Sequence, residues 1–296
     1  MDKKKIVLII PYRGIGDLIF HIPLIKGLYD KYNSKINIIT NSVNKAKILL
    51  GNEFYINKIY YLSFIRENQI KNSYRFLQKI NLLKADLSIL TAPSNRLIIP
   101  LLFSNSKKKI YFKKDNINDL SKYIFFQSIK QFPNISFKKD YRLVLNNKKI
   151  KNQKIFLSID SHHDQNNWEE YNYINLTKKL LKIKKIKKIF INFSPNKKKQ
   201  FNIIYKKFFK NKKIFFTYNS KFNDIVNIIS GSSTIIGNES GPVCLGASFG
   251  KNVFSIYNPI HTPNLSSKII NKKIKYFNSK KLKSENIIRK IIKAIS

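Results

Sequence analysis

Residues 6–23 read IVLIIPYRGIGDLIFHIP, and this stretch decides the fold. Its first five residues, Ile6–Ile10, form a short apolar run rich in β-branched side chains, which is typical of a strand buried on both faces of a parallel sheet. A polar turn with two glycines follows, and the apolar residues of 19–32 recur with the period of a helix. A strand, a glycine turn and a helix in this order predict the first half of a βαβ unit.

The same alternation continues along the chain and predicts an α/β fold of two doubly wound domains. The first half should hold further strands at 36–40, 58–61 and 87–90 and helices at 43–50 and 65–83. Residues 146–154 are polar and Lys-rich without apolar periodicity, so we expect domains of residues 1–150 and 151–296. The second should hold strands at 155–159, 188–192, 213–216, 234–237 and 252–256 and helices at 171–181, 197–209, 222–230 and 242–249. Ligands should bind in a cleft at the carboxyl ends of both sheets.

The charge of the chain is extreme, with 57 basic and 16 acidic residues and a net charge of +41. Nearly all the cations are lysines spread along the whole chain, whereas proteins that read nucleic acid favour arginine. We therefore expect no specific nucleic-acid partner but an attraction to anionic surfaces, including membranes. One cysteine, Cys244, excludes an intramolecular disulfide, and no apolar stretch approaches the roughly 18 residues of a membrane span. A cytoplasmic, soluble or peripheral protein is expected.

Asp17 is the most informative residue of the first stretch. Gly14 and Gly16 let the backbone approach a ligand closely, but Ile19 stands where a dinucleotide-binding fingerprint needs its third glycine. A carboxylate in the first turn of a helix can accept a proton from a hydroxyl group. It can equally do no more than complement the helix dipole, and the residues alone leave both readings open.

A second informative stretch, residues 235–250, reads IIGNESGPVCLGASFG. A strand enters a Ser-Gly turn, and Pro242 stands at the expected first helical position. Free backbone N–H groups at Ser240, Gly241 and Val243 would suit a diphosphate. The small residues after them would let the helix pack closely on its sheet, which a plain crossover helix would also need.

Together the two stretches resemble the signatures of glycosyltransferase family 9, the heptosyltransferases of lipopolysaccharide core assembly. The first matches at Gly14, Gly16, Asp17 and Pro23, and the second runs from Asn238 to Ala247. The resemblance implies a GT-B architecture, in which two Rossmann-like domains face a central cleft, with the acceptor on the N-terminal domain and the nucleotide sugar on the C-terminal one. It implies inverting transfer of a heptose-like sugar without a metal or other cofactor.

The resemblance also implies a set of site residues and partners. Asp17 would be the catalytic base, with Arg13, Gly14 and Gly16 in the acceptor-side loop. The donor expected from the resemblance is an ADP-sugar. It would be bound by Ser161, Asn166, Trp168, Ser220, Asn238, Glu239, Ser240, Gly241, Pro242 and Val243. The acceptor would be an anionic glycolipid of the lipopolysaccharide core type, reached from the cytoplasm at the inner face of the inner membrane, with peripheral contact to that anionic surface.

Some positions depart from the family pattern. Glu239 replaces the usual Asp, Cys244 replaces His, and Asn166 stands where a Lys usually helps to bind the donor. Two other functions therefore remain open: a degenerate, non-catalytic protein that binds nucleotide sugars or polyanions, and a nucleotide-sugar epimerase of the same fold. A metal site at residues 160–164, which read DSHHD, is disfavoured because adjacent side chains rarely converge on one ion.

Overall fold

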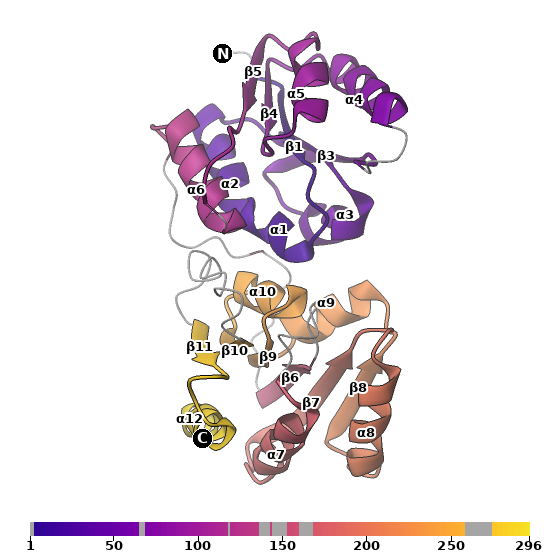
Figure 1. Ribbon diagram of the computed structural model, residues 1–296, viewed down its shortest axis with the longest axis vertical. Coiled ribbons are helices and arrows are strands. Elements are labelled where there is room, and N and C mark those ends of the chain that lie inside the picture. The colour runs from indigo at the N-terminus through magenta and orange to yellow at the C-terminus, as the bar shows by residue number, and fades with distance from the viewer. Residues whose placement is uncertain are drawn as a thin grey trace. The chain divides into compact units, whose positions relative to one another are not determined.

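The protein, described from a computed structural model, consists of two compact units, Met1–Leu143 and Val144–Ser296. The structure describes residues 3–64, 69–117, 119–135, 143, 153–159, 168–257 and 274–296. Each unit is built on one parallel sheet, drawn in Figure 1, and the division falls slightly before the expected boundary at residues 150 and 151. No helix among the described residues is both long and apolar enough to cross a bilayer.

The first unit has a five-stranded sheet in the order β3-β2-β1-β4-β5. Its strands are β1 (Ile6–Ile10), β2 (Ile36–Thr40), β3 (Ile56–Tyr61), β4 (Leu87–Leu90) and β5 (Lys108–Tyr111). Its helices are α1 (Ile15–Phe20), α2 (Ile22–Tyr32), the 3₁₀-helix η1 (Ser42–Asn44), α3 (Ala46–Leu50), α4 (Gln69–Leu83), α5 (Asn95–Leu102) and α6 (Leu120–Gln131).

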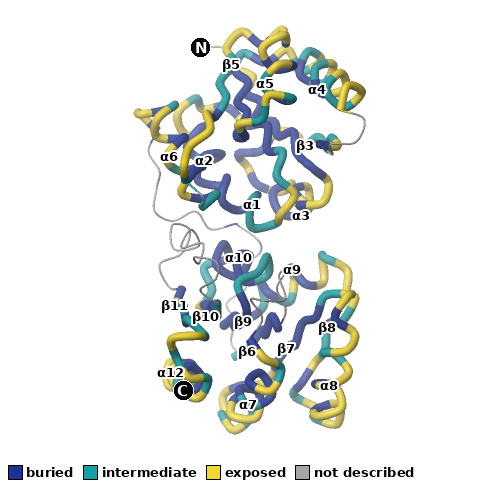
Figure 2. The backbone as a smooth tube through the Cα atoms, in the orientation of Figure 1, coloured by how far each residue is buried: buried dark blue, intermediate teal, exposed yellow. Residues whose placement is uncertain are grey.

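The order of these strands explains why β1 is apolar throughout. β1 pairs with β2 on one side and β4 on the other, and all five of its residues are buried. The chain winds outward from β1 in both directions, and right-handed crossovers then place helices on both faces of the sheet. Figure 2 shows the central strands of the sheet in dark blue, with exposed yellow stretches on α4 and α6. The doubly wound arrangement that the sequence predicts is confirmed here.

Two helix boundaries in this unit differ from the prediction. The single helix expected at 19–32 is two helices, α1 and α2, and the first begins at Ile15. His21 ends α1 and precedes α2, whose first turn contains Pro23, so the break lies where a proline can begin a new helix. The helix expected at 43–50 is likewise divided by Lys45, which has a left-handed φ of 57°.

The second unit has a six-stranded sheet in the order β11-β10-β9-β6-β7-β8. Its strands are β6 (Gln153–Ser158), β7 (Ile186–Phe193), β8 (Ile214–Tyr218), β9 (Thr234–Asn238), β10 (Asn252–Tyr257) and β11 (Ile274–Asn278). Its helices are α7 (Glu170–Leu181), α8 (Lys198–Phe208), α9 (Phe222–Ser230), α10 (Gly241–Ser248) and α12 (Ser284–Ile295). Strands β6 to β10 and helices α7 to α10 lie where the sequence predicts them, to within two residues at each end, whereas β11 and α12 were not predicted.

Two glycines allow the close packing at the centre of this sheet. A Cβ on Gly237 of β9 would overlap the backbone carbonyl of Ser158 on β6, so the neighbouring strands depend on its absence. A Cβ on Gly246 of α10 would lie 2.5 Å from Cγ1 of Ile235. The expectation that small residues let this helix approach the sheet is therefore confirmed at Gly246.

Candidate functional site

The carboxyl end of the first sheet is polar where β1 and β4 lie side by side. Here the crossovers from β1 and from β4 run in opposite directions, which makes this position the topological switch point where open α/β sheets bind ligands. Tyr12 follows β1 and donates a hydrogen bond from its hydroxyl to the carbonyl of Thr91, which follows β4, at 3.1 Å. The loops after the two strands are therefore tied together at this point.

Asp17 occupies the third position of α1, directly after the loop that leaves β1. Its carboxylate accepts a hydrogen bond from the backbone N–H of Gly14 at 3.0 Å. A Cβ at position 14 would lie 2.7 Å from Oδ2 of Asp17, so glycine is needed there for the approach of the carboxylate. Gly14 has an ordinary φ of −74°, so a left-handed backbone conformation is not the reason for glycine at this position.

The environment of Asp17 raises the pKa of its carboxyl group above the usual value. Burial disfavours the charged form, and the hydrogen bond from Gly14 offsets part of this effect. A carboxylate that holds its proton more tightly than usual is a better proton acceptor when it is ionised. The carboxylate of Asp17 thus caps α1 and holds its proton more tightly than an exposed carboxyl group, which fits both readings of this residue.

His21, which the sequence analysis did not select, joins Asp17 to β4 through buried hydrogen bonds. Its Nδ1 lies 2.6 Å from the backbone carbonyl of Asp17, and its Nε2 lies 2.9 Å from Oγ1 of Thr91. A carbonyl only accepts, so Nδ1 carries the proton. Complete burial lowers the pKa of His21 to about 4, so the ring is neutral and Nε2 can only accept. The one hydroxyl proton of Thr91 has two acceptors within reach, Nε2 of His21 at 2.9 Å and the carbonyl of Ile9 at 3.1 Å. His21 stands four residues after Asp17, a spacing that brings two helical residues together, and this spacing was the signal in the sequence that could have identified it.

The other residues assigned to the acceptor-side loop lie beside Asp17 but make fewer contacts. Arg13 is exposed at the start of the loop, and Gly16 is half-buried within α1. The carboxyl end of β2 adds polar groups that the sequence analysis did not assign. Asn44 donates to the carbonyl of Tyr12 at 3.2 Å and to Oγ1 of Thr40 at 2.6 Å, which fixes the loop after β1 from its other side.

The second unit has its own switch point between β6 and β9. The side chain of Asn238, at the end of β9, donates to the carbonyl of Ile159 and accepts from the backbone N–H of Trp168 at 2.9 Å. Oγ of Ser240 lies 3.2 Å from Oγ of Ser158, at the end of β6. Asn238 is fully buried, so its side chain holds the surrounding chain in place, whereas the next residues, Glu239 and Ser240, are half-buried.

Helix α10 begins directly after this point, with Ser240 as its N-cap and Pro242 as its second residue instead of its first. No acceptor among the described residues receives the backbone N–H of Ser240, Gly241 or Val243. Such groups at a helix N-terminus carry a partial positive charge. Glu239, the residue before Ser240, is half-buried. Its backbone N–H donates to the carbonyl of Ile256 at 3.1 Å.

The remaining donor-side residues lie in different surroundings. Trp168 is 4% exposed, its ring packs edge-on against Tyr173, and its Nε1 donates to Oγ of Ser284 at 3.1 Å, so it offers no free face to a ligand. Ser220 is exposed beyond β8, with β7 and β6 between it and β9. Ser161 and Asn166 lie outside the described residues, as does the DSHHD segment.

No group of three or more His, Cys, Asp and Glu side chains in the described part of the chain is arranged to hold a metal ion. Cys244 of α10 forms no disulfide, is 6% exposed and lies among the buried residues of that helix. At the N-terminus of α10, the groups available to an anion are the backbone amides of Ser240, Gly241 and Val243.

No protein-family profile matches the chain, and no curated protein sequence matches it either. Solved structures do match. The glycosyltransferase family 9 protein of Veillonella parvula has a TM-score of 0.81 at 14% identity, over 100% of this chain and 98% of its own. The heptosyltransferase WaaC of E. coli with ADP has a TM-score of 0.73 at 12% identity, over 99% and 100%. A putative UDP-N-acetylglucosamine 2-epimerase of Listeria monocytogenes has a TM-score of 0.56 at 12% identity, over 100% and 88%. The chain therefore has the two-domain α/β fold that these GT-B proteins share.

Proposed function

We propose that the protein is an inverting glycosyltransferase that uses a nucleoside diphosphate sugar as its donor and needs no metal ion. The observation that carries the proposal is the carboxylate of Asp17, which is half-buried at the switch point of the first sheet with a raised pKa. The fold supports it too, because heptosyltransferase structures with ADP and with ADP-2-deoxy-2-fluoro heptose share it. By analogy with them, the donor proposed here is an ADP-sugar of the heptose type.

The proposed reaction is one displacement at the anomeric carbon of the donor. Asp17 accepts the proton of an acceptor hydroxyl while that oxygen forms a bond to the anomeric carbon and the bond from this carbon to the diphosphate breaks. The configuration of the sugar is thereby inverted. The leaving nucleoside diphosphate carries negative charge, which the amides of Ser240, Gly241 and Val243 would stabilise. An anionic glycolipid of the lipopolysaccharide core type is the acceptor class proposed, and the basic surface would favour work at the cytoplasmic face of the inner membrane.

The test is release of nucleoside diphosphate from a panel of ADP-, UDP- and GDP-sugars, with and without a deacylated core glycolipid. Acceptor-dependent release from one nucleotide class, with a product of inverted anomeric configuration, would support the proposal. Conversion of a UDP-sugar to its C2 epimer without release would instead identify an epimerase, whose fold the chain also shares. Saturable sugar-nucleotide binding with neither reaction would identify a non-catalytic binding protein.

Activity should persist in excess chelator, because the proposed leaving-group site consists of backbone amides. Turnover in millimolar EDTA should stay within about twofold of the untreated rate, since removal of a required metal costs far more. Loss of turnover in EDTA that added Mg²⁺ or Mn²⁺ restores would contradict the proposal and direct attention to residues 160–164.

A further inference from the structure

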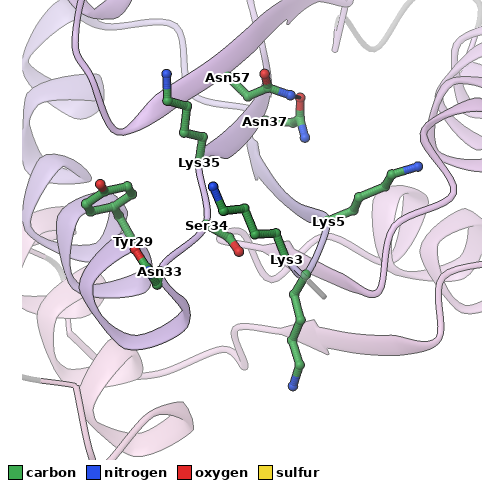
Figure 3. A pocket seen from close by; sticks show the side chains of 9 residues that line it. Lys3, Lys5, Tyr29, Asn33, Ser34, Lys35, Asn37 and Asn57 are labelled. Carbon is green, nitrogen blue, oxygen red and sulfur yellow. Dashed lines mark hydrogen bonds between the residues drawn. The ribbon is translucent and has the colours of Figure 1, made fainter. Parts of the chain in front are cut away.

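A basic cavity of about 300 Å³ lies at the amino-terminal end of the first sheet, at the opposite end of β1 from Asp17. Residues from the segment before β1, from the end of α2 and from β2 and β3 surround it, as Figure 3 shows. They are Lys3, Lys4, Lys5, Tyr29, Asn33, Ser34, Lys35, Asn37 and Asn57. Its volume is at the lower end of the range for small-molecule sites.

Four of these nine residues are lysines and none is acidic. The pairing of Ile6 with Ile36 places Lys5 and Lys35, the residues before them, at the ends of neighbouring strands. Like charges on adjacent strands repel each other. The nearby carboxylate of Asp86 is already occupied, because it binds the ammonium of Lys107 at 2.8 Å and the backbone N–H of Lys5 at 2.9 Å.

One of the four ammonium groups has an aromatic partner, since Lys4 lies 5.3 Å from the centre of the Tyr32 ring. In the view of Figure 3, Lys3 and Lys35 extend on one side of the Asn37–Asn57 pair and Lys5 on the other. An anion in the cavity would therefore be balanced chiefly by Lys3 and Lys35.

The floor of the cavity is polar and ordered. Asn37 is 7% exposed and Ser34 is 3% exposed, so polar side chains are buried beneath the exposed lysines. Asn57 donates to Oδ1 of Asn37 at 3.0 Å, across an irregularity in the pairing of β2 with β3. Bulges of this kind often redirect a side chain beside a functional site. Asn37 also donates to the carbonyl of Ile6 at 3.4 Å, and Ser34 donates to the carbonyl of Tyr32 at 3.1 Å, so the residues beneath the lysines are held in place by their own hydrogen bonds.

We propose that this cavity binds a phosphoryl group, as a phosphate or diphosphate carried by a soluble ligand or by a lipid headgroup. Lys3 and Lys35 supply the charge. The site lies apart from Asp17, and it does not depend on the transferase proposal. Ammonium groups bind phosphate as point charges without demanding one geometry, which suits a site built from lysines instead of arginines.

The test compares wild type with two double variants of equal charge in calorimetric titrations with inorganic pyrophosphate at fixed physiological salt. Lys3→Gln/Lys35→Gln changes the cavity, and Lys114→Gln/Lys130→Gln removes the same charge from exposed positions elsewhere on the same unit. The cavity variant should lose about tenfold in affinity, or ~1.4 kcal/mol, while the control stays near wild type. The N-terminus of α10 is unchanged in all three proteins, so any pyrophosphate that it binds contributes equally to each titration.

Lys3→Arg/Lys35→Arg should restore most of the affinity, which would separate the effect of charge from that of folding. Equal weakening in the cavity variant and the control, or no saturable binding by wild type, would overturn the proposal. Sedimentation with vesicles of phosphatidic acid in phosphatidylcholine then identifies the source of the phosphoryl group. A cavity-specific loss of vesicle binding identifies a lipid headgroup, whereas a cavity-specific loss for pyrophosphate alone identifies a soluble ligand.

Discussion

At the residue scale, Asp17 combines two roles that substitution can separate. An asparagine keeps a carbonyl-type oxygen that can accept the N–H of Gly14, so Asp17→Asn should preserve α1 while it removes the proton acceptor. We expect turnover to fall by roughly 10²–10⁴, the usual contribution of a general base, with little change in donor affinity. Initial rates and calorimetric titration of an ADP-sugar measure the two quantities. A variant that kept most of the wild-type turnover would show that Asp17 is a helix cap alone.

His21 should make the stability of the protein depend on pH. Its pKa is about 4 in the folded chain against 6.5 for the free side chain, so between these values the unfolded state binds a proton that the folded state does not. Stability is therefore fully present above pH 6.5 and declines as the pH falls towards 4, by up to about 3 kcal/mol. Urea unfolding of wild type and His21→Gln at several pH values measures this contribution. A wild-type decline no steeper than that of the variant would contradict it.

At the element scale, the position of α10 depends on the contact between β6 and β9. A methyl group at Gly237 would meet the backbone of Ser158, which cannot rotate away, so Gly237→Ala should lower stability by about 1–3 kcal/mol. The matched control is Gly231→Ala, whose Cβ would lie 3.2 Å from the carbonyl oxygen of Asn227 and should cost much less. Thermal unfolding midpoints compare the two. Equal unfolding midpoints for the two variants would show that β6 and β9 move apart to fit the methyl group without loss of stability.

The sequence predicts these elements well wherever the apolar pattern is continuous. Ile6–Ile10 and Ile36–Thr40 begin and end where predicted, because the first is apolar throughout, the second is β-branched at every position except Asn37, and both are buried between two strands. The start of α1 at Ile15 was not predicted, because Gly14 and Gly16 favour a turn, whereas the hydrogen bond from the N–H of Gly14 to Asp17 starts the helix within this segment.

The polar surroundings of the candidate site were harder to predict than the site itself. Asp17 and Ser240 stand next to glycines in local motifs that the sequence displays directly. The partner of His21 is Thr91, 70 residues away, and only the pairing of β1 with β4 brings them together. Apolar periodicity reveals which strands form but not which strands become neighbours, so contacts of this kind need the structure.

At the scale of the whole molecule, the net charge of +41 requires that specific anion binding be distinguished from general attraction. Interactions between exposed charges are screened over about 10 Å at 0.1 M salt, whereas hydrogen bonds from backbone amides act at short range. Binding to vesicles of phosphatidylglycerol should therefore weaken by roughly tenfold or more between 0.05 and 0.5 M NaCl.

The affinity for ADP should fall much less over the same range of salt if the N-terminus of α10 holds its diphosphate. Sedimentation and calorimetry over the same salt series measure both. If ADP affinity fell as steeply as vesicle binding, and inorganic polyphosphate displaced ADP at equal charge, surface lysines would account for nucleotide binding and the donor site proposed at α10 would be wrong.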